Sequence, residues 1–259
     1  MSAPAPALHA PALHTPARPG PAMLDTPAGG VVDVWFLPIR YRAGWVPLLS
    51  AAERDRLTAL DGSPAAASLV TSRAGQRLIT ARYLGADPRD VQPVRTCGHC
   101  ADPGHGRPHL PGAPFDFSVS HSARWLMVAV AGSGPVGADV DTLDDRRPLD
   151  GLARVALGPA EQAAFRETPG PARRAAFLTA WTRKEAAVKL TGHGLAVPPA
   201  RVDVSGPYAL TAGVPGWPDP PPRLTTVDAP AGHVAALATS GLLTGVRRRT
   251  GVLRGFTPR

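Results

Sequence analysis

The side chains of this sequence best suited to chemistry are those of Lys184, Glu185 and Lys189, which stand close together in the run 181–189. Lys184 and Lys189 are the only lysines among the 28 Lys and Arg residues of the chain. A position that stays lysine against this bias indicates a need for a compact ammonium with a movable proton, which a guanidinium cannot supply. Glu185 and Lys189 are also four residues apart on an expected helix, so an ordinary surface salt bridge is an open alternative.

A second motif with acidic residues lies in the segment 136–141. Asp139 and Asp141 are two residues apart on a β-type segment, so both carboxylates point to the same side of a sheet. Together with Glu185 they offer three hard oxygen ligands, a set suited to a Mg²⁺ ion that keeps several waters and binds substrate phosphates. The alternative is a strand end that runs into the polar turn 142–145.

Four ordered motifs identify a family. The chain resembles the 4′-phosphopantetheinyl transferases, in particular the longer, monomeric, surfactin-synthetase-activating type that primes carrier proteins of polyketide and nonribosomal peptide synthesis. The resemblance covers about residues 31 to 242. It rests on G-R-P at 106–108, F-S-V-S-H-S at 117–122, G-A-D-V-D at 137–141 and W-T-R-K-E-A-A-V-K at 181–189.

The resemblance implies a reaction. Enzymes of this family move the phosphopantetheine arm of coenzyme A onto a serine of an acyl or peptidyl carrier protein and release 3′,5′-ADP. By this resemblance Asp139, Asp141 and Glu185 coordinate Mg²⁺, and Glu185 or a metal-bound water serves as base. Lys189 faces the pyrophosphate and stabilises or protonates the leaving group. Glu185, Lys189 and Asp141 are therefore the expected catalytic residues.

The resemblance also implies a seat for coenzyme A. Arg107 and His121 match positions at the adenosine 3′-phosphate end, and Ser120 matches a contact beside it. Arg73 matches a phosphate-binding arginine, and Arg56 does so more loosely. An exposed helix arginine or a core histidine are the ordinary alternatives for such residues taken singly. The full expected set is Arg56, Arg73, Arg107, Pro108, Ser120, His121, Lys184 and Lys189.

The sequence departs from the family pattern at three positions. Asp141 stands where many relatives have glutamate, so its carboxylate reaches one methylene less. Arg107 replaces a common lysine and gains a bidentate fork for phosphate. Ser118 replaces the usual asparagine and loses an amide donor. None of these changes removes a charge from the expected site, so activity is still expected.

Periodicity predicts an α+β fold. Strands are expected at 31–37, 115–119, 126–131, 136–140, 201–204, 223–227 and 233–239. Helices are expected after the capping box Ser50–Glu53, over 67–84 and over 172–190, with a loop at 86–114. The family resemblance implies a pseudo-twofold pair of similar halves, 31–134 and 135–242, with the active site between them. A disordered Ala/Pro-rich tail is expected at 1–30 and a basic tail at 243–259.

Composition limits the remaining possibilities. The chain has 259 residues, of which 44% are hydrophobic, and no apolar run reaches the roughly 18 residues of a membrane span. The N-terminal stretch lacks the apolar region of a signal peptide. The sequence therefore predicts a soluble, cytoplasmic enzyme that is not bound to membranes, and the family resemblance implies a monomer.

Cys97 and Cys100 form a single C-x-x-C knuckle with His105 and His109 nearby. Zinc binding would need two of the histidines at unusual spacing, and the competing interpretation is a Gly-rich turn with reduced thiols. A disulfide is the third alternative.

The formal net charge of +8 keeps a second class of protein open. The run Arg247–Arg249 is typical of a phosphate-attracting cluster in a nucleic-acid-binding protein. Aromatic residues are sparse and no DNA-binding motif is visible, so we expect a solvated basic terminus and no nucleic-acid partner. A coenzyme A-binding relative without transfer activity is a further alternative.

Overall fold

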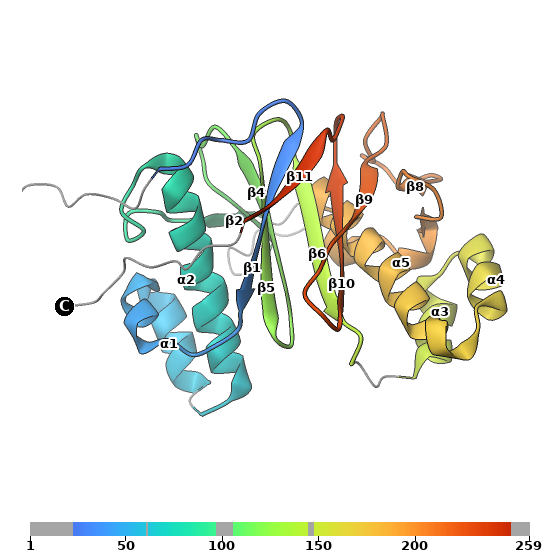
Figure 1. Cartoon of the computed structure of the whole chain (residues 1–259), viewed down its shortest axis with the longest axis horizontal. Coiled ribbons are helices and arrows are strands. Elements are labelled where there is room, and N and C mark those ends of the chain that lie inside the picture. The colour runs from blue at the N-terminus through green and yellow to red at the C-terminus, as the bar shows by residue number, and fades with distance from the viewer. Residues whose placement is uncertain (1–22, 61, 97–105, 145–147, 250–259) are drawn as a thin grey trace, which may run out of the picture.

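The computed structural model describes residues 23–60, 62–96, 106–144 and 148–249. Two β-sheets pack face to face, and each is covered on its outer side by one long helix (Figure 1). Residues 1–22 of the predicted N-terminal tail, together with Cys97, Cys100 and His105, lie outside the described residues. Among the described helices, none is both long enough and apolar enough to cross a membrane.

The first half of the chain supplies one sheet and its helix. Its elements are β1 (Val31–Pro38), η1 (Ala43–Leu48), α1 (Ala51–Ala59), α2 (Pro64–Leu84), β2 (Val94–Thr96), β3 (Arg107–His109), β4 (Asp116–Ser122) and β5 (Trp125–Ala131). The loop expected at 86–114 contains the short hairpin of β2 and β3. Three-residue strands rich in Pro, Arg and His carry too little alternation to be recognised from sequence.

The second half supplies the other sheet. Its elements are β6 (Val136–Thr142), α3 (Leu149–Ala156), α4 (Pro159–Glu167), α5 (Gly170–Thr191), η2 (Gly194–Ala196), η3 (Pro199–Arg201), β7 (Val202–Asp203), β8 (Leu210–Thr211), β9 (Arg223–Val227), β10 (His233–Thr239) and β11 (Gly245–Arg249). Helix α5 ends at Gly192, which adopts a left-handed conformation with φ +75°, as the predicted glycine stop requires. The short helices α3 and α4 were not predicted.

The two sheets repeat one topology. In each half a first strand is followed by a long helix and then by a hairpin whose second strand pairs antiparallel with the first. The strand orders are accordingly β1-β5-β4 and β6-β10-β9, with β11 added beside β1. This arrangement of helices and strands confirms the predicted α+β class.

Strands β1 and β5 are buried on both faces because one face meets α2 and the other meets the second sheet. Along β1, Val32 and Val34 contact the second sheet, whereas Trp35 and Leu37 lie in the cluster under α2. Burial on both faces explains why the sequence of these strands is almost continuously apolar.

Strand β11 corrects the expectation of a basic tail, because residues 245–249 pair in parallel with β1. Asp33 of β1 is fully buried, and its carboxylate accepts hydrogen bonds from Arg247 Nε at 2.6 Å and Arg249 Nε at 2.9 Å. Tyr83 Oη donates to the same carboxylate at 2.8 Å. Two arginines of the cluster on which the nucleic-acid alternative depended are therefore engaged within the fold.

Two glutamates join short helices to the long helices. Glu53 closes the predicted capping box with Ser50, and its Oε2 also lies 3.0 Å from the Arg77 guanidinium on α2. In the second half Glu161 Oε2 accepts the N–H of Gly158 at 2.8 Å and pairs with Lys184 Nζ on α5 at 2.6 Å. The same device thus anchors a short helix to the long helix of each half.

The surroundings of Lys184 correct its predicted role. Its side chain is 2% exposed, and its ammonium donates to Glu161 and to the carbonyl oxygens of Pro199 and Val202. Burial lowers the pKa of Lys184, and the hydrogen bond to Glu161 opposes this effect. All three N–H donors point into the interior, so Lys184 does not reach a phosphate of coenzyme A. Standing next to Glu185 on a helix, it faces a different side from Glu185 and Lys189.

Gly137 sets the distance between α5 and β6. A Cβ atom at this position would overlap the carbonyl oxygen of Ala186 and lie 2.7 Å from the backbone nitrogen of Leu190. Both contacts are with helix backbone, so no side-chain rotation can relieve them. Glycine at 137 thereby allows the helix to lie directly on the strand, with Glu185 and Lys189 beside Asp139.

We predict that Gly137→Ala lowers the free energy of unfolding by about 3 kcal/mol or more, at the upper end of the cost of overpacking. Gly151→Ala is the matched control, because the nearest atom to a Cβ there is 4.0 Å away and the residue lies in a helix. The control should be neutral or stabilising by up to about 1 kcal/mol. Urea unfolding of both variants measures the difference, and equal stabilities would show that the close approach is not required.

We predict that Lys184→Met lowers the free energy of unfolding by about 3–5 kcal/mol, because the buried Glu161 carboxylate is left without its cation. Adding Glu161→Gln should recover part of this loss, since the second change removes the unpaired charge. Denaturant unfolding of the single and double variants tests the pair. A Lys184→Met protein as stable as the wild type would return Lys184 to the group of candidate ligand-binding residues.

Candidate active site

Polar side chains at alternate positions of β4 connect the two halves. Asp116 Oδ2 accepts the N–H of Val136 at 2.8 Å, and Ser118 Oγ accepts the N–H of Ala138 at 3.0 Å. Strands β4 and β6 belong to different sheets, so these side chains take the place of a backbone ladder. Ser118, which stands where the family has asparagine, needs only an acceptor oxygen for this contact.

The next two serines of β4 reach the carboxylates of β6. Ser120 Oγ donates to Asp139 Oδ1 at 2.6 Å, and Ser122 Oγ donates to Asp141 Oδ1 at 3.3 Å. The backbone N–H of Thr142 also donates to Asp141 Oδ1 at 2.7 Å. The first half of the chain therefore orients the acidic pair that the second half supplies.

Helix α5 brings a cation and a third carboxylate to the same place. Lys189 Nζ lies 2.6 Å from Asp139 Oδ1 and 3.3 Å from the carbonyl oxygen of Ala138. Burial raises the pKa of Glu185; Lys189 opposes this rise, while Asp139 and Asp141 add to it. Lys189 thus pairs across to the strand and is not confined to a surface salt bridge along its own helix.

These residues line one cleft of about 1100 Å³. The predicted residues in its wall are Arg56, Arg73, Arg107, Pro108, Ser120, His121, Asp139, Asp141, Glu185 and Lys189. The cleft has several charged side chains in its wall and is large enough for a nucleotide-sized ligand. Within the described parts of the chain, Lys184 is the one predicted site residue that does not line the cleft.

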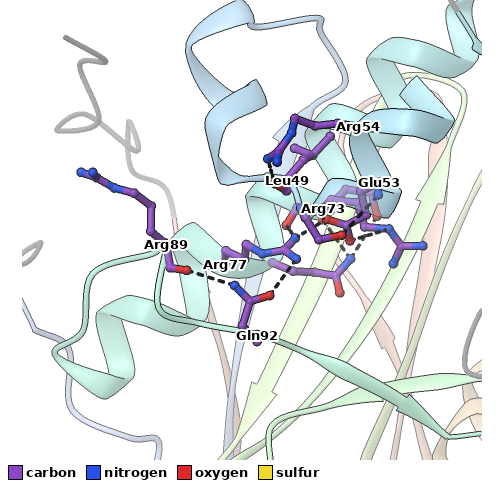
Figure 2. A network of polar contacts seen from close by, with 10 residues as sticks. Leu49, Glu53, Arg54, Arg73, Arg77, Arg89 and Gln92 are labelled. Atoms are coloured by element: carbon purple, nitrogen blue, oxygen red, sulfur yellow. Dashed lines mark hydrogen bonds and ion pairs between the residues drawn. The ribbon is translucent and has the colours of Figure 1, made fainter. Parts of the chain in front are cut away.

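Arg73 of α2 forms another part of the wall. Arg73 Nε lies 3.4 Å from Glu53 Oε1, and Arg77 shares the other oxygen of the same carboxylate (Figure 2). Arg77 continues the network by donating to Gln92 Oε1 at 3.5 Å. Burial lowers the pKa of Arg73, Glu53 raises it, and Arg56 lowers it further. The ion pair with Glu53, drawn in Figure 2, holds the side chain of Arg73 in position in the cleft wall.

Arg107 is held where the halves meet. Its Nη2 donates to Asp116 Oδ2 and, at 2.9 Å, to the carbonyl oxygen of Val136. His121 follows Ser120 on β4, and burial together with the charges of Lys189 and Arg73 lowers the pKa of its imidazole. Lys189 and Arg73 therefore lie close enough to the imidazole to affect its pKa.

Arg95 is a cleft residue that sequence reasoning missed. It lies on β2, where it pairs with Pro108 of β3, and its Nη1 donates to the carbonyl oxygen of Gly106 at 2.9 Å. No spacing rule links Arg95 to the G-R-P motif, because the two come together only when the hairpin forms. A basic residue opposite the motif across a predicted hairpin is the signal that could have found it.

The donor chemistry of the acidic group fits Mg²⁺, which favours carboxylate oxygens. Burial is the main cause of the raised pKa of Glu185, and the negative charges of Asp139 and Asp141, which a cation would offset, add to it. Among the described residues, no three His, Cys, Asp or Glu side chains already stand close enough to hold a metal ion. Asp139 instead pairs with Lys189, so metal binding at these residues requires the side chains to readjust.

Known proteins are similar to the part of the chain that carries the acidic residues of this cleft. A model of the 4′-phosphopantetheinyl transferase superfamily matches residues 135–217. The chain is 35% identical over 100 residues to the 4′-phosphopantetheinyl transferase AcpT of Salmonella typhimurium, covering 39% of this chain and 52% of the relative. It is 31% identical over 125 residues to HetI of Nostoc, covering 46% and 49%.

The Bacillus subtilis 4′-phosphopantetheinyl transferase is 30% identical over 95 residues, covering 36% of this chain and 41% of the relative. The chain spans about half the length of the curated relatives it matches. The matched segment contains the acidic pair of β6 and the motif of α5. The residues that match the superfamily model thus include Asp139, Asp141, Glu185 and Lys189.

Proposed function

We propose that this chain transfers the 4′-phosphopantetheine arm of coenzyme A to a serine of an acyl or peptidyl carrier protein, with Mg²⁺, and releases 3′,5′-ADP. The observation that carries the proposal is the cleft itself, which combines three carboxylates and Lys189 with several arginines. Carboxylates that can hold a metal ion, together with cationic side chains, suit a substrate that carries a pyrophosphate and a further phosphate. The match of residues 135–217 to the model of the transferase superfamily supports the same reaction.

The carboxylates and the lysine serve the pyrophosphate. Asp139, Asp141 and Glu185 would hold Mg²⁺, which supplies neutralising charge to the pyrophosphate oxygens. The ammonium of Lys189, which lies 2.6 Å from Asp139 Oδ1, would donate a proton to the phosphate that leaves. Glu185, whose pKa is raised by burial, can accept the proton of the incoming serine.

The nucleophile of this reaction belongs to the carrier protein. Ser120 and Ser122 line or border the cleft, but their hydroxyls donate to Asp139 and Asp141. In that orientation both hydroxyls are engaged with the carboxylates that would hold the metal ion. This arrangement supports transfer to an outside hydroxyl over formation of a covalent intermediate on the chain.

The partner and setting form part of the proposal. The carriers would be those of polyketide or nonribosomal peptide synthesis, and the enzyme would act as a cytoplasmic monomer. The cationic charge of the chain would favour the approach of acidic carriers and of the polyanionic coenzyme A.

We predict that Glu185→Gln abolishes transfer, because glutamine keeps the shape of the side chain but loses the charge and the basic oxygen. The matched control is Glu167→Gln at the exposed end of α4, which should transfer at the wild-type rate. Mass spectrometry of apo carrier proteins incubated with coenzyme A and Mg²⁺ measures the added phosphopantetheine. Chelation of Mg²⁺ should stop the wild type, and near-normal loading by Glu185→Gln would refute the assignment.

Lys189→Arg tests whether an ammonium is needed and not merely a positive charge. We expect turnover to fall by a hundredfold or more, the usual scale for loss of an acid-base group, because a guanidinium does not release its proton and is wider. The thermal melting temperature should change little, since the charge beside Asp139 is retained. An unchanged loading rate would make the Lys189–Asp139 pair a structural ion pair.

A further inference from the structure

The ammonium of Lys189 engages Asp139, which is one of the carboxylates proposed above to hold Mg²⁺. Its Nζ lies 2.6 Å from Asp139 Oδ1 and 3.3 Å from the carbonyl oxygen of Ala138. The hydroxyl of Ser120 donates to the same carboxylate oxygen at 2.6 Å. One oxygen of Asp139 therefore accepts from two donors, and one of these donors carries a full positive charge.

The two partners of this ion pair differ in their freedom to move. The side chain of Asp139 is 8% exposed, whereas that of Lys189 is 29% exposed and lines the cleft wall. Because the pair is partly buried, salt screens it less than it screens a surface pair. The carboxylate is held inside, but the flexible stem of the lysine allows its ammonium to turn toward the cleft without a movement of α5.

A divalent cation at the acidic group would need the same carboxylate. Two cations held a few ångströms apart repel each other, and they would share the single negative charge of Asp139. Asp141 offers little compensation, because its Oδ1 already accepts the hydroxyl of Ser122 and the N–H of Thr142. Mg²⁺ takes such oxygens as direct ligands in a strict geometry, so donors already bound to them weaken its binding.

We propose that Lys189 and the divalent cation compete for Asp139, and that an anionic substrate relieves this competition by drawing the ammonium of Lys189 into the cleft. The metal ion and a nucleotide with a pyrophosphate then bind cooperatively, and Lys189 couples them. Each ligand raises the affinity for the other by the same factor. The inference rests on the proposed function for the metal ligands and for the nucleotide, but the competition itself concerns binding and involves no transfer.

The first test measures metal binding to the protein without substrate. Mn²⁺ replaces Mg²⁺ as the probe because it also prefers carboxylate oxygens, and its free concentration is read from its electron paramagnetic resonance signal. We expect Lys189→Gln to lower the Kd of Mn²⁺ about tenfold or more, the scale of one hydrogen bond to a charged group. Lys189→Met should do the same, whereas Lys189→Arg, which keeps the cation, should bind Mn²⁺ no more tightly than the wild type.

The control variant is Arg73→Gln, which removes a different positive charge from the cleft wall. Arg73 pairs with Glu53 and not with the acidic group, so its loss should strengthen Mn²⁺ binding much less than the loss of Lys189 does. An equal gain in both variants would show that only the overall potential of the cleft matters, and the inference would be wrong. Equal affinities in the wild type and Lys189→Gln, or no Mn²⁺ binding by either, would also refute it.

The second test measures the coupling between metal and nucleotide. Calorimetric titration gives the Kd of coenzyme A with and without Mg²⁺ for the wild type and for Lys189→Gln. We expect Mg²⁺ to strengthen coenzyme A binding by a larger factor in the wild type, and an equal factor in both proteins would contradict the coupling role of Lys189. Tighter Mn²⁺ binding by Lys189→Gln beside a wild type that loads no carrier protein would sustain this inference and refute the transferase function.

Discussion

The candidate site depends on the close contact between α5 and β6 at Gly137. Because this residue has no side chain, the helix backbone at Ala186 lies against the strand. Glu185 and Lys189 lie on α5 close to that contact, and Lys189 pairs with the buried Asp139 of β6. A larger separation would move the ammonium away from the carboxylate and disperse the charges on which both metal binding and proton transfer depend.

In each half of the chain, a glutamate at the start of a short helix attaches that helix to the long helix. Glu53 and Glu161 each accept a backbone N–H of their own helix and pair with a cation of the long helix. The repeat explains why the two lysines of α5 have different surroundings. Lys184 corresponds in function to Arg77 and is buried, whereas Lys189 faces the cleft. The scarcity of lysine indicated a special requirement at both positions, but for Lys184 the requirement is a compact ammonium that fits a closed pocket.

Periodic segments were predictable from sequence, and segments that depend on distant pairing were not. The two long helices and the strands of both sheets carry strong patterns, and Ser50 with Glu53 marks the start of α1. The family motifs gave the acidic residues and Lys189. By contrast, β11 brings Arg247 and Arg249 to the buried carboxylate of Asp33, whereas its arginine-rich sequence alone is typical of a solvated terminus. Arg95 enters the cleft through a short hairpin, which has no local periodicity.

The contact between the halves makes the site a joint product of both. Side chains of β4, not a backbone ladder, satisfy the N–H groups of β6, and the same row continues into the two serines that orient the carboxylates. Arg107 adds a third link because it contacts both Asp116 and the backbone of β6. Neither half holds a complete site alone, since one orients the ligands that the other provides. A shift between the halves would therefore change the acidic group and the arginine-lined wall together, which couples the two ends of a bound substrate.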